Sequence, residues 1–119
     1  KLGMSICYDL RFPNLYRKLT KKGAQFFSIP AAFTFTTGKA HWHSLIRARA
    51  IENGCFVFAP AQCGVHDNGR RTYGHSMIVN PWGKILVEAK KNKKQIISTI
   101  INIDEIGHSR KKIPSMTQF

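Results

Sequence analysis

Three short apolar runs separated by two segments of helical character place the strongest constraint on the fold of this chain. The runs occupy residues 2–6, 25–29 and 55–61. The first intervening segment, residues 13–23, opens with a proline suited to a first helical turn, and the second, residues 40–53, repeats its apolar residues at helical spacing. Strands that alternate with helices predict a layered α/β fold, whose sites are usually built from loops at the carboxyl ends of the strands.

The second half of the sequence predicts a meander of short strands. Residues 76–79 and 84–88 flank an Asn-Pro-Trp-Gly turn at residues 80–83, which is typical of a strand–turn–strand unit. A β-branched run at residues 95–103 predicts a last strand. The remaining stretches predict loops or carry only a basic, polar pattern: residues 31–38, residues 62–73 and the tail to residue 119.

The net charge is +13, from 19 Lys and Arg against 6 Asp and Glu. Such a balance can indicate a nucleic-acid or anionic-membrane partner. The basic residues, however, cluster beside predicted helix ends and turns, and no stripe interleaves them with aromatic residues for base stacking. No apolar run approaches the roughly 20 residues that cross a bilayer, and no signal peptide opens the chain. We therefore expect no membrane and no nucleic-acid partner, with a basic nucleic-acid-binding module as the weaker alternative.

The cysteines and histidines give no metal or disulfide pattern. Three cysteines are an odd number and form no CxxC pair, so neither a disulfide framework nor a zinc ribbon is predicted, and a reduced, cytoplasmic compartment is the simplest expectation. No two histidines form a tight ligand motif with a third ligand nearby, and His41 and His43, two residues apart, would splay on a helix. We expect no metal and no other cofactor.

Cys7 lies where the first apolar run meets the first helical segment, and two interpretations apply to it. A free cysteine is often a small buried hydrophobe. A nucleophile at a sharp strand-to-helix turn, by contrast, projects from the sheet, and the backbone N–H of Tyr8 could then point at a developing oxyanion.

The segment around Cys7, GMSICYDLRFP at residues 3–13, resembles the nucleophile segment of the nitrilase superfamily of carbon–nitrogen hydrolases, and most closely that of its Nit-type amidase branch. Further matches follow in order: PAAFT at 30–34, TG at 37–38, HW at 41–42, RARAIEN at 47–53, AQ at 61–62, YGHS at 73–76, NPWG at 80–83 and IP at 113–114. The resemblance covers nearly the whole chain, and so long an ordered series is highly specific.

The resemblance implies a four-layer α-β-β-α sandwich, of which residues 1–119 would be the C-terminal half, with the N-terminal half absent. It also implies a Glu-Lys-Cys catalytic set with Cys7 as the nucleophile. In that scheme the cysteine attacks a small linear amide, ammonia or an amine leaves, and water hydrolyses the thioester. The expected substrates are small ω-amides of dicarboxylic acids, including deaminated glutathione, and the full-length enzyme is expected to be a homo-oligomer.

Only the cysteine of that catalytic set maps onto this chain, because the family's glutamate and lysine precede Lys1. Asp9 and Glu52 are expected to be structural partners of nearby arginines, with Arg49 paired to Glu52 on one helix face. The 119 residues alone are therefore expected to be inactive. An inactive remnant of a split gene is the alternative origin.

Phe33 and Thr34 follow the second predicted strand and are candidates for the substrate pocket, with a plain core position as the alternative for Phe33. Arg47 and Arg49 are candidates for a substrate carboxylate, although ion pairing is favoured for Arg49. His43 departs from the branch, which commonly has an acidic residue after His-Trp.

Overall fold

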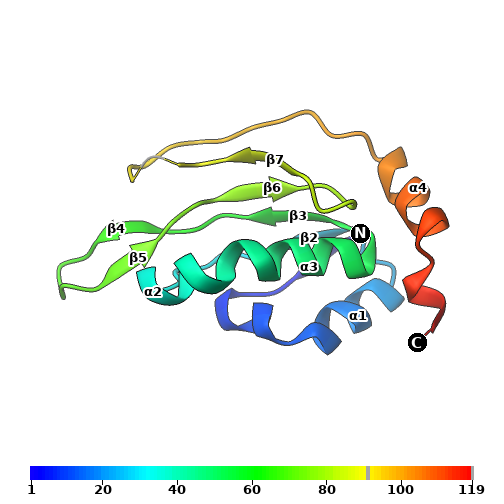
Figure 1. Ribbon diagram of the computed structural model, residues 1–119, viewed down its shortest axis with the longest axis horizontal. Helices are drawn as coiled ribbons and strands as arrows, with labels where there is room; N and C mark the ends of the chain where they lie inside the picture. Colours follow the sequence, from blue (N-terminus) through cyan, green and yellow to red (C-terminus); the bar gives the residue numbers. More distant parts are fainter. Residues whose placement is uncertain (91, 119) are drawn as a thin grey trace.

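The computed structural model describes residues 1–90 and 92–118 and contains a five-stranded sheet with the strand order β1-β2-β3-β6-β7 (Figure 1). The five strands are β1 (Leu2–Met4), β2 (Phe26–Ser28), β3 (Phe56–Ala59), β6 (Met77–Val79) and β7 (Ile85–Glu88). The first three are parallel, and β6 and β7 continue the sheet in antiparallel fashion. The predicted βαβαβ order, followed by a hairpin, is confirmed.

Two helices, α1 (Pro13–Lys21) and α3 (His43–Asn53), connect the parallel strands and cover one face of the sheet (Figure 1). A short α2 (Phe35–Thr37) and a π-helical turn (Gly38–Trp42) lead into α3, so the helix predicted for residues 40–53 starts through an irregular turn. The core between helices and sheet consists of fully buried side chains, among them Tyr16, Phe27, Trp42, Ile46 and Val57. The α/β class expected from the sequence is therefore confirmed as one helical layer on one sheet.

The opposite face of the same sheet is much less covered. Leu2 and Met4 alternate with the buried Gly3 and are 54% and 75% exposed. On the neighbouring strands β2 and β3, the rings of Phe26 and Phe58 stack with centroids 6.0 Å apart. An apolar face of this kind is what a second packed sheet covers in a sandwich.

Residues 62–73, predicted as a loop, instead contain a two-stranded hairpin of β4 (Cys63–Val65) and β5 (Arg71–Tyr73). The turn between them is held by the backbone, since the N–H of His66 donates to Arg70 O at 2.8 Å. Asn68 Oδ1 also accepts the N–H of Arg70 at 2.9 Å. The strands are short and lack apolar alternation, and for this reason the pattern did not predict them.

The strand predicted at residues 95–103 is wrong. No ladder among the described residues includes this stretch, and Ile96 and Ile100 are almost fully exposed. A β-branched composition favours extended backbone but does not supply a partner strand. The tail also holds more structure than expected, namely α4 (Asp104–Lys112) and a 3₁₀ turn (Ser115–Gln118), with acidic residues in the first turn of α4 and basic ones in its last, as the helix dipole favours.

The predicted turn at residues 80–83 joins β6 to β7. Asn80 Oδ1 accepts the backbone N–H groups of Trp82 and Lys84 at 3.0 and 2.9 Å. Gly83 has a φ of +88°, and a Cβ there would lie 2.6 Å from Ile51, so only glycine fits. In the described part of the chain, no helix has both the length and the apolar character that crossing a membrane requires.

Candidate functional site

The carboxyl ends of the three parallel strands converge at one edge of the sheet. Just past β1, the backbone N–H of Cys7 donates to Pro30 O at 2.8 Å, and Ala31 N–H donates to Pro60 O at 2.9 Å. Ala31 also forms a parallel bridge with Ala61. Chain segments that are distant in sequence are thereby held beside Cys7, as expected for the carboxyl edge of an α/β sheet.

Cys7 itself has a strained backbone. Its φ is +45°, a left-handed value that is uncommon outside glycine, while its side chain is exposed enough to line a pocket. The strain is sustained by the hydrogen bond to Pro30 and by the 3₁₀ turn Cys7–Arg11 that starts at this residue. Sharp strand-to-helix turns of this kind aim a nucleophile away from the sheet, and non-glycine strain tends to cluster at active sites.

The first turn after Cys7 leaves one backbone donor available. Asp9 Oδ2 accepts the N–H of Ile6 at 2.9 Å, and Asp9 N–H donates to Ile6 O at 3.0 Å. Across the described residues, no hydrogen bond uses the N–H of Tyr8. The role predicted for the Tyr8 N–H, donation to an oxyanion beside Cys7, stays a prediction.

Cys7 opens into a pocket of about 550 Å³. Its other lining residues come from the three strand ends, from the start of β6 and from the segment after β7: Ile6, Pro30, Ala31, Ala32, Pro60, Ala61, Gln62, Ser76 and Gln95. Ser76 Oγ fixes one wall, because it accepts Ala61 N–H at 2.7 Å and donates to Ala61 O at 3.2 Å. Pro30, Ala31 and Ala32 belong to the same motif as Phe33 and Thr34, but only the last two were predicted for the substrate pocket.

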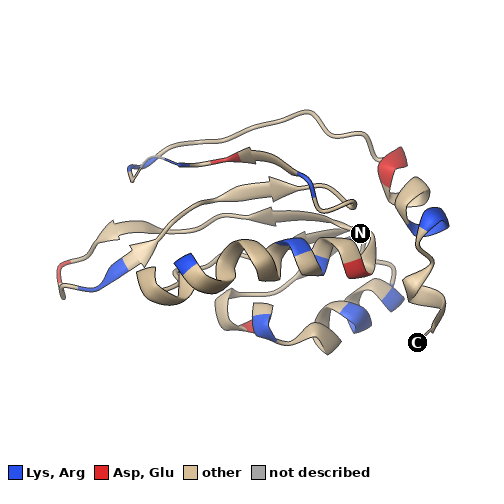
Figure 2. Cartoon of the chain, viewed as in Figure 1, with Lys and Arg blue, Asp and Glu red and all other residues tan. Residues whose placement is uncertain are grey.

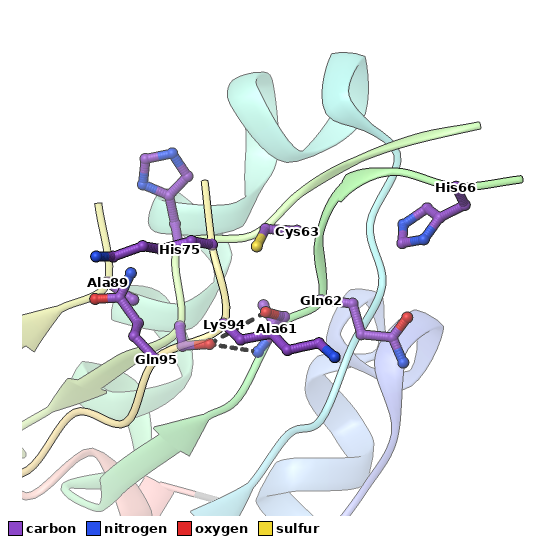
Figure 3. Close-up of a pocket in the computed structure, with 10 residues that line it drawn as sticks. Ala61, Gln62, Cys63, His66, His75, Ala89, Lys94 and Gln95 are labelled. Atoms are coloured by element: carbon purple, nitrogen blue, oxygen red, sulfur yellow. Dashed lines mark hydrogen bonds between the residues drawn. The ribbon is translucent and has the colours of Figure 1, made fainter. Parts of the chain in front are cut away.

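A second pocket of about 430 Å³ adjoins the first and shares Ala61, Gln62, Ser76 and Gln95 with it (Figure 3). Lys93 and Lys94 line this second pocket. Figure 3 shows Lys94 reaching across beside Ala61 and Gln62. The two pockets therefore form a continuous depression, in which Cys7 lines the first pocket and the two lysines line the second.

No carboxylate of residues 1–90 or 92–118 lines the Cys7 pocket. Glu52 is engaged elsewhere, in the predicted ion pair with Arg49 Nη1 at 3.0 Å. Asp9 is structural as predicted, but its partner is the Ile6 N–H rather than an arginine, because the turn points its carboxylate at its own backbone. The described residues thus bring no carboxylate to the Cys7 pocket.

Arg49 connects α3 to the turn that carries Cys7. Its guanidinium is almost fully buried, and its Nε and Nη2 donate to Leu10 O at 3.0 and 2.8 Å. The carbonyl belongs to the Cys7–Arg11 turn, so the arginine fixes that turn against the helix. Arg47, the other candidate for a substrate carboxylate, donates through Nε to Gly83 O at 2.8 Å instead.

Phe33 and Thr34 lie away from the Cys7 pocket. Phe33 is 7% exposed and packs on Trp42 with ring centroids 5.0 Å apart, which is the core position considered as its alternative. Thr34 is exposed, and its Oγ1 lies 2.7 Å from Thr37 Oγ1. Neither residue lines the pocket in the described chain, and their role in substrate binding stays a prediction.

A second cluster of ionisable groups lies beside the depression. Glu88 Oε2 accepts hydrogen bonds from His43 Nε2 at 2.9 Å and from His75 Nδ1 at 2.8 Å. Burial of the carboxyl opposes its ionisation, but the two histidine hydrogen bonds outweigh that effect and leave the pKa of Glu88 below its ordinary value. His41, by contrast, contacts Arg11, so His41 and His43 diverge as their spacing predicted. The sequence did not predict Glu88 beside His43, because the two residues are 45 positions apart.

An α/β sheet that presents a strained, accessible cysteine at the end of its first strand has the arrangement of a nucleophile-elbow protein. Residues 1–111 match the family model described as carbon-nitrogen hydrolase. The chain therefore belongs to the carbon–nitrogen hydrolase family.

Individual relatives agree with this membership. The chain is 52% identical over 115 residues to a deaminated glutathione amidase of Synechocystis sp., covering 97% of this chain and 42% of the relative. Its structure resembles the C. elegans NitFhit protein with a TM-score of 0.95 at 44% identity, covering all of this chain and 29% of the other. It also resembles a mutant amidase from Nesterenkonia sp. AN1 that carries covalent acetamide at its active-site cysteine, with a TM-score of 0.66 at 32% identity, covering 74% of this chain and 33% of that one. The chain spans less than half the length of each.

Proposed function

We propose that the protein containing this chain is an amidase that hydrolyses small linear amides through a thioester on Cys7. The observation that carries the proposal is the strained, accessible Cys7 at the carboxyl edge of the sheet, facing a pocket of about 550 Å³. The Nesterenkonia relative, which is modified at its active-site cysteine, supports the same chemistry.

The reaction follows from the atoms at that edge. The Cys7 thiolate attacks the amide carbon, and the Tyr8 N–H donates to the oxygen on which negative charge develops. The C–N bond breaks as the nitrogen takes a proton and leaves as ammonia or an amine. Water then attacks the thioester carbon, releasing the carboxylic acid and the thiol.

The chain supplies the nucleophile and one oxyanion donor but not the proton-transfer groups. The base and the lysine implied by the family resemblance would come from the part of the protein that precedes these residues, as the longer relatives suggest. The 119 residues alone are accordingly proposed to be inactive, and the complete protein to be a homo-oligomer in the cytoplasm, where its three free cysteines stay reduced.

The proposed substrate is a short ω-amide that also carries a carboxylate, as deaminated glutathione does. Lys93 and Lys94 support this class, because their amines line the pocket that continues from the one holding Cys7. The relative named deaminated glutathione amidase supports it independently.

A small molecule is proposed as the partner in preference to a nucleic acid. Figure 2 shows that the basic residues are distributed over α1, α3, the β4–β5 hairpin, the segments flanking β7, and α4, rather than along one element. The electrostatic pattern of a nucleic-acid site is a continuous basic stripe.

The test is to incubate the complete natural protein with a panel of ω-amides and one nitrile, measuring ammonia release and, after acid quench, the intact mass. We expect amide turnover and an acyl adduct mapping to Cys7 by peptide mass spectrometry. Turnover with an adduct on another residue, or turnover that survives Cys7→Ala, would overturn the mechanism. A stop codon or frameshift directly upstream of the Lys1 codon would favour the inactive remnant.

A further inference from the structure

Three side chains with metal-binding atoms meet outside the Cys7 pocket, where the start of α3 approaches the outer strands of the sheet. His43 is the first residue of α3, His75 lies just before β6, and Glu88 ends β7. One ligand atom from each residue lies within 4.8 Å of the others. Three elements that are far apart in sequence thus converge on one point.

We propose that His43, His75 and Glu88 bind a zinc-type divalent cation in a structural site. Two imidazole nitrogens and a carboxylate oxygen suit Zn²⁺, whereas Mg²⁺ and Ca²⁺ favour all-oxygen sites. The cation fastens α3 to the two outer strands. The inference goes beyond the amidase function and does not depend on it.

Cation binding requires the three ligand atoms to change their separations, and all three already lie within 4.8 Å of one another. The two histidine nitrogens must approach each other from at most that distance, while the carboxylate oxygen moves away from both. Zinc bonds of about 2.0–2.2 Å in a tetrahedral site separate neighbouring ligand atoms by about 3.3 Å. The two N–O separations are now 2.9 and 2.8 Å, so the carboxylate would retreat by about half an ångström to make room. With the cation bound, His43 coordinates through Nε2 with its proton on Nδ1, and His75 coordinates through Nδ1 with its proton on Nε2.

His75 is held in place for this role by its surroundings. Tyr73 stacks on its ring with centroids 4.1 Å apart, and Trp42 Nε1 donates to the His75 carbonyl at 2.9 Å. In Figure 3 the His75 ring points away from Gln62 and Gln95, at the edge of the second pocket, which the residue also lines. The residue also has a φ of +62°, a strained value for histidine.

Space for water lies beside one of the three ligands, His75. A cavity of about 170 Å³ is lined by His75, Tyr73 and Cys63, which is large enough for several water molecules. The residue after His75 is Ser76, whose hydroxyl fixes Ala61 in the Cys7 pocket. A cation on His75 would therefore stiffen one wall of that pocket.

The experiment is equilibrium dialysis of the complete natural protein against ZnCl₂ after chelator treatment, with Co²⁺ as a spectroscopic probe. We expect one zinc per chain, a tetrahedral Co²⁺ absorption band and a higher melting temperature with zinc. His43→Gln and Glu88→Gln, which keep polar side chains of similar size, should each weaken zinc binding by about tenfold or more.

Matched control variants distinguish zinc binding at these three residues from zinc binding at other histidines or cysteines. His66→Gln should leave zinc affinity unchanged, because His66 bonds Thr72 and lies outside the cluster. Should His75→Gln fail to fold, His75→Asn tolerates the positive φ but is too short to coordinate. Absence of saturable zinc binding would mean a hydrogen-bonded His–Glu–His group only and would overturn the proposal. So would zinc binding that is lost in Cys63→Ser but kept in His43→Gln.

Discussion

Cys7 and Cys55 lie at opposite ends of the same parallel sheet, and their surroundings differ accordingly. Cys7 follows β1 at the carboxyl edge, where its strained backbone opens into a pocket. Cys55 precedes β3 at the amino edge and is completely buried. Its Sγ donates to Ala24 O at 3.5 Å and accepts a hydrogen bond from Arg110 Nη2 at 3.2 Å.

The same residue type is thus accessible at the carboxyl end of one strand and buried at the amino end of another, so strand direction decides the surroundings of each cysteine. Burial raises the pKa of the Cys55 thiol, with Arg110 and Thr20 offsetting only part of that effect. A buried thiol with a raised pKa is a poor nucleophile. At the carboxyl edge, strand ends diverge into loops and leave space for a ligand.

The largest expected effect lies at the carboxyl edge. In the complete protein, Cys7→Ala should lower amide turnover by about 10³-fold or more, because the thioester can no longer form. The melting temperature should change little, since the Cys7 side chain is small and only partly buried. Cys63→Ser is the matched control and should keep most of the activity. A Cys7→Ala protein that stays active would contradict the catalytic role of Cys7, and one that unfolds would show a structural role like that of Cys55.

A second change tests the link between the helix layer and the Cys7 turn. Arg49→Ala removes a buried guanidinium that holds Leu10 O and Glu52, and should lower the free energy of unfolding by about 2–4 kcal/mol in chemical denaturation. Arg49→Lys should recover only part of the lost free energy of unfolding, because a lysine ammonium cannot reproduce the three hydrogen bonds of the guanidinium. An Arg49→Ala protein as stable as wild type would show that the Cys7–Arg11 turn does not depend on Arg49.

Much of this arrangement follows from sequence pattern, and the remainder depends on long-range contacts. The order of strands and helices, the turn at Asn80 and the Arg49–Glu52 pair all rest on local spacing, which the sequence displays directly. The Glu88 cluster and the strand-end pocket join residues that are distant in the chain, and no local period encodes them. The strand prediction for residues 95–103 was wrong for the same reason: a strand needs a partner strand as well as a β-branched composition.

A third change probes the amino edge. Cys55→Ala should lower the free energy of unfolding by about 1–2 kcal/mol, because it leaves a small cavity and removes a partner of Arg110. Amide turnover should stay close to normal at a temperature where the variant is folded. Denaturant titration and ammonia release measure the two effects separately. Loss of turnover without loss of stability would contradict a structural role for Cys55.

The smallest expected effect depends on pH and concerns Glu88, between the two edges. Because the folded-state pKa of Glu88 is lowered, its ionised form adds stability above its ordinary pKa of 4.5. That contribution is lost as the pH falls through the lower folded value. In chelator-treated protein, Glu88→Gln should therefore cost about 1 kcal/mol at pH 7, and the difference from wild type should shrink steadily below pH 4.5. Denaturant titrations of both proteins from pH 3 to 7 measure it, with Asp104→Asn at the exposed first residue of α4 as the control that should show little change. A difference that grows with falling pH would mean that the histidines do not stabilise the carboxylate, and the charge arrangement described for this cluster would then be wrong.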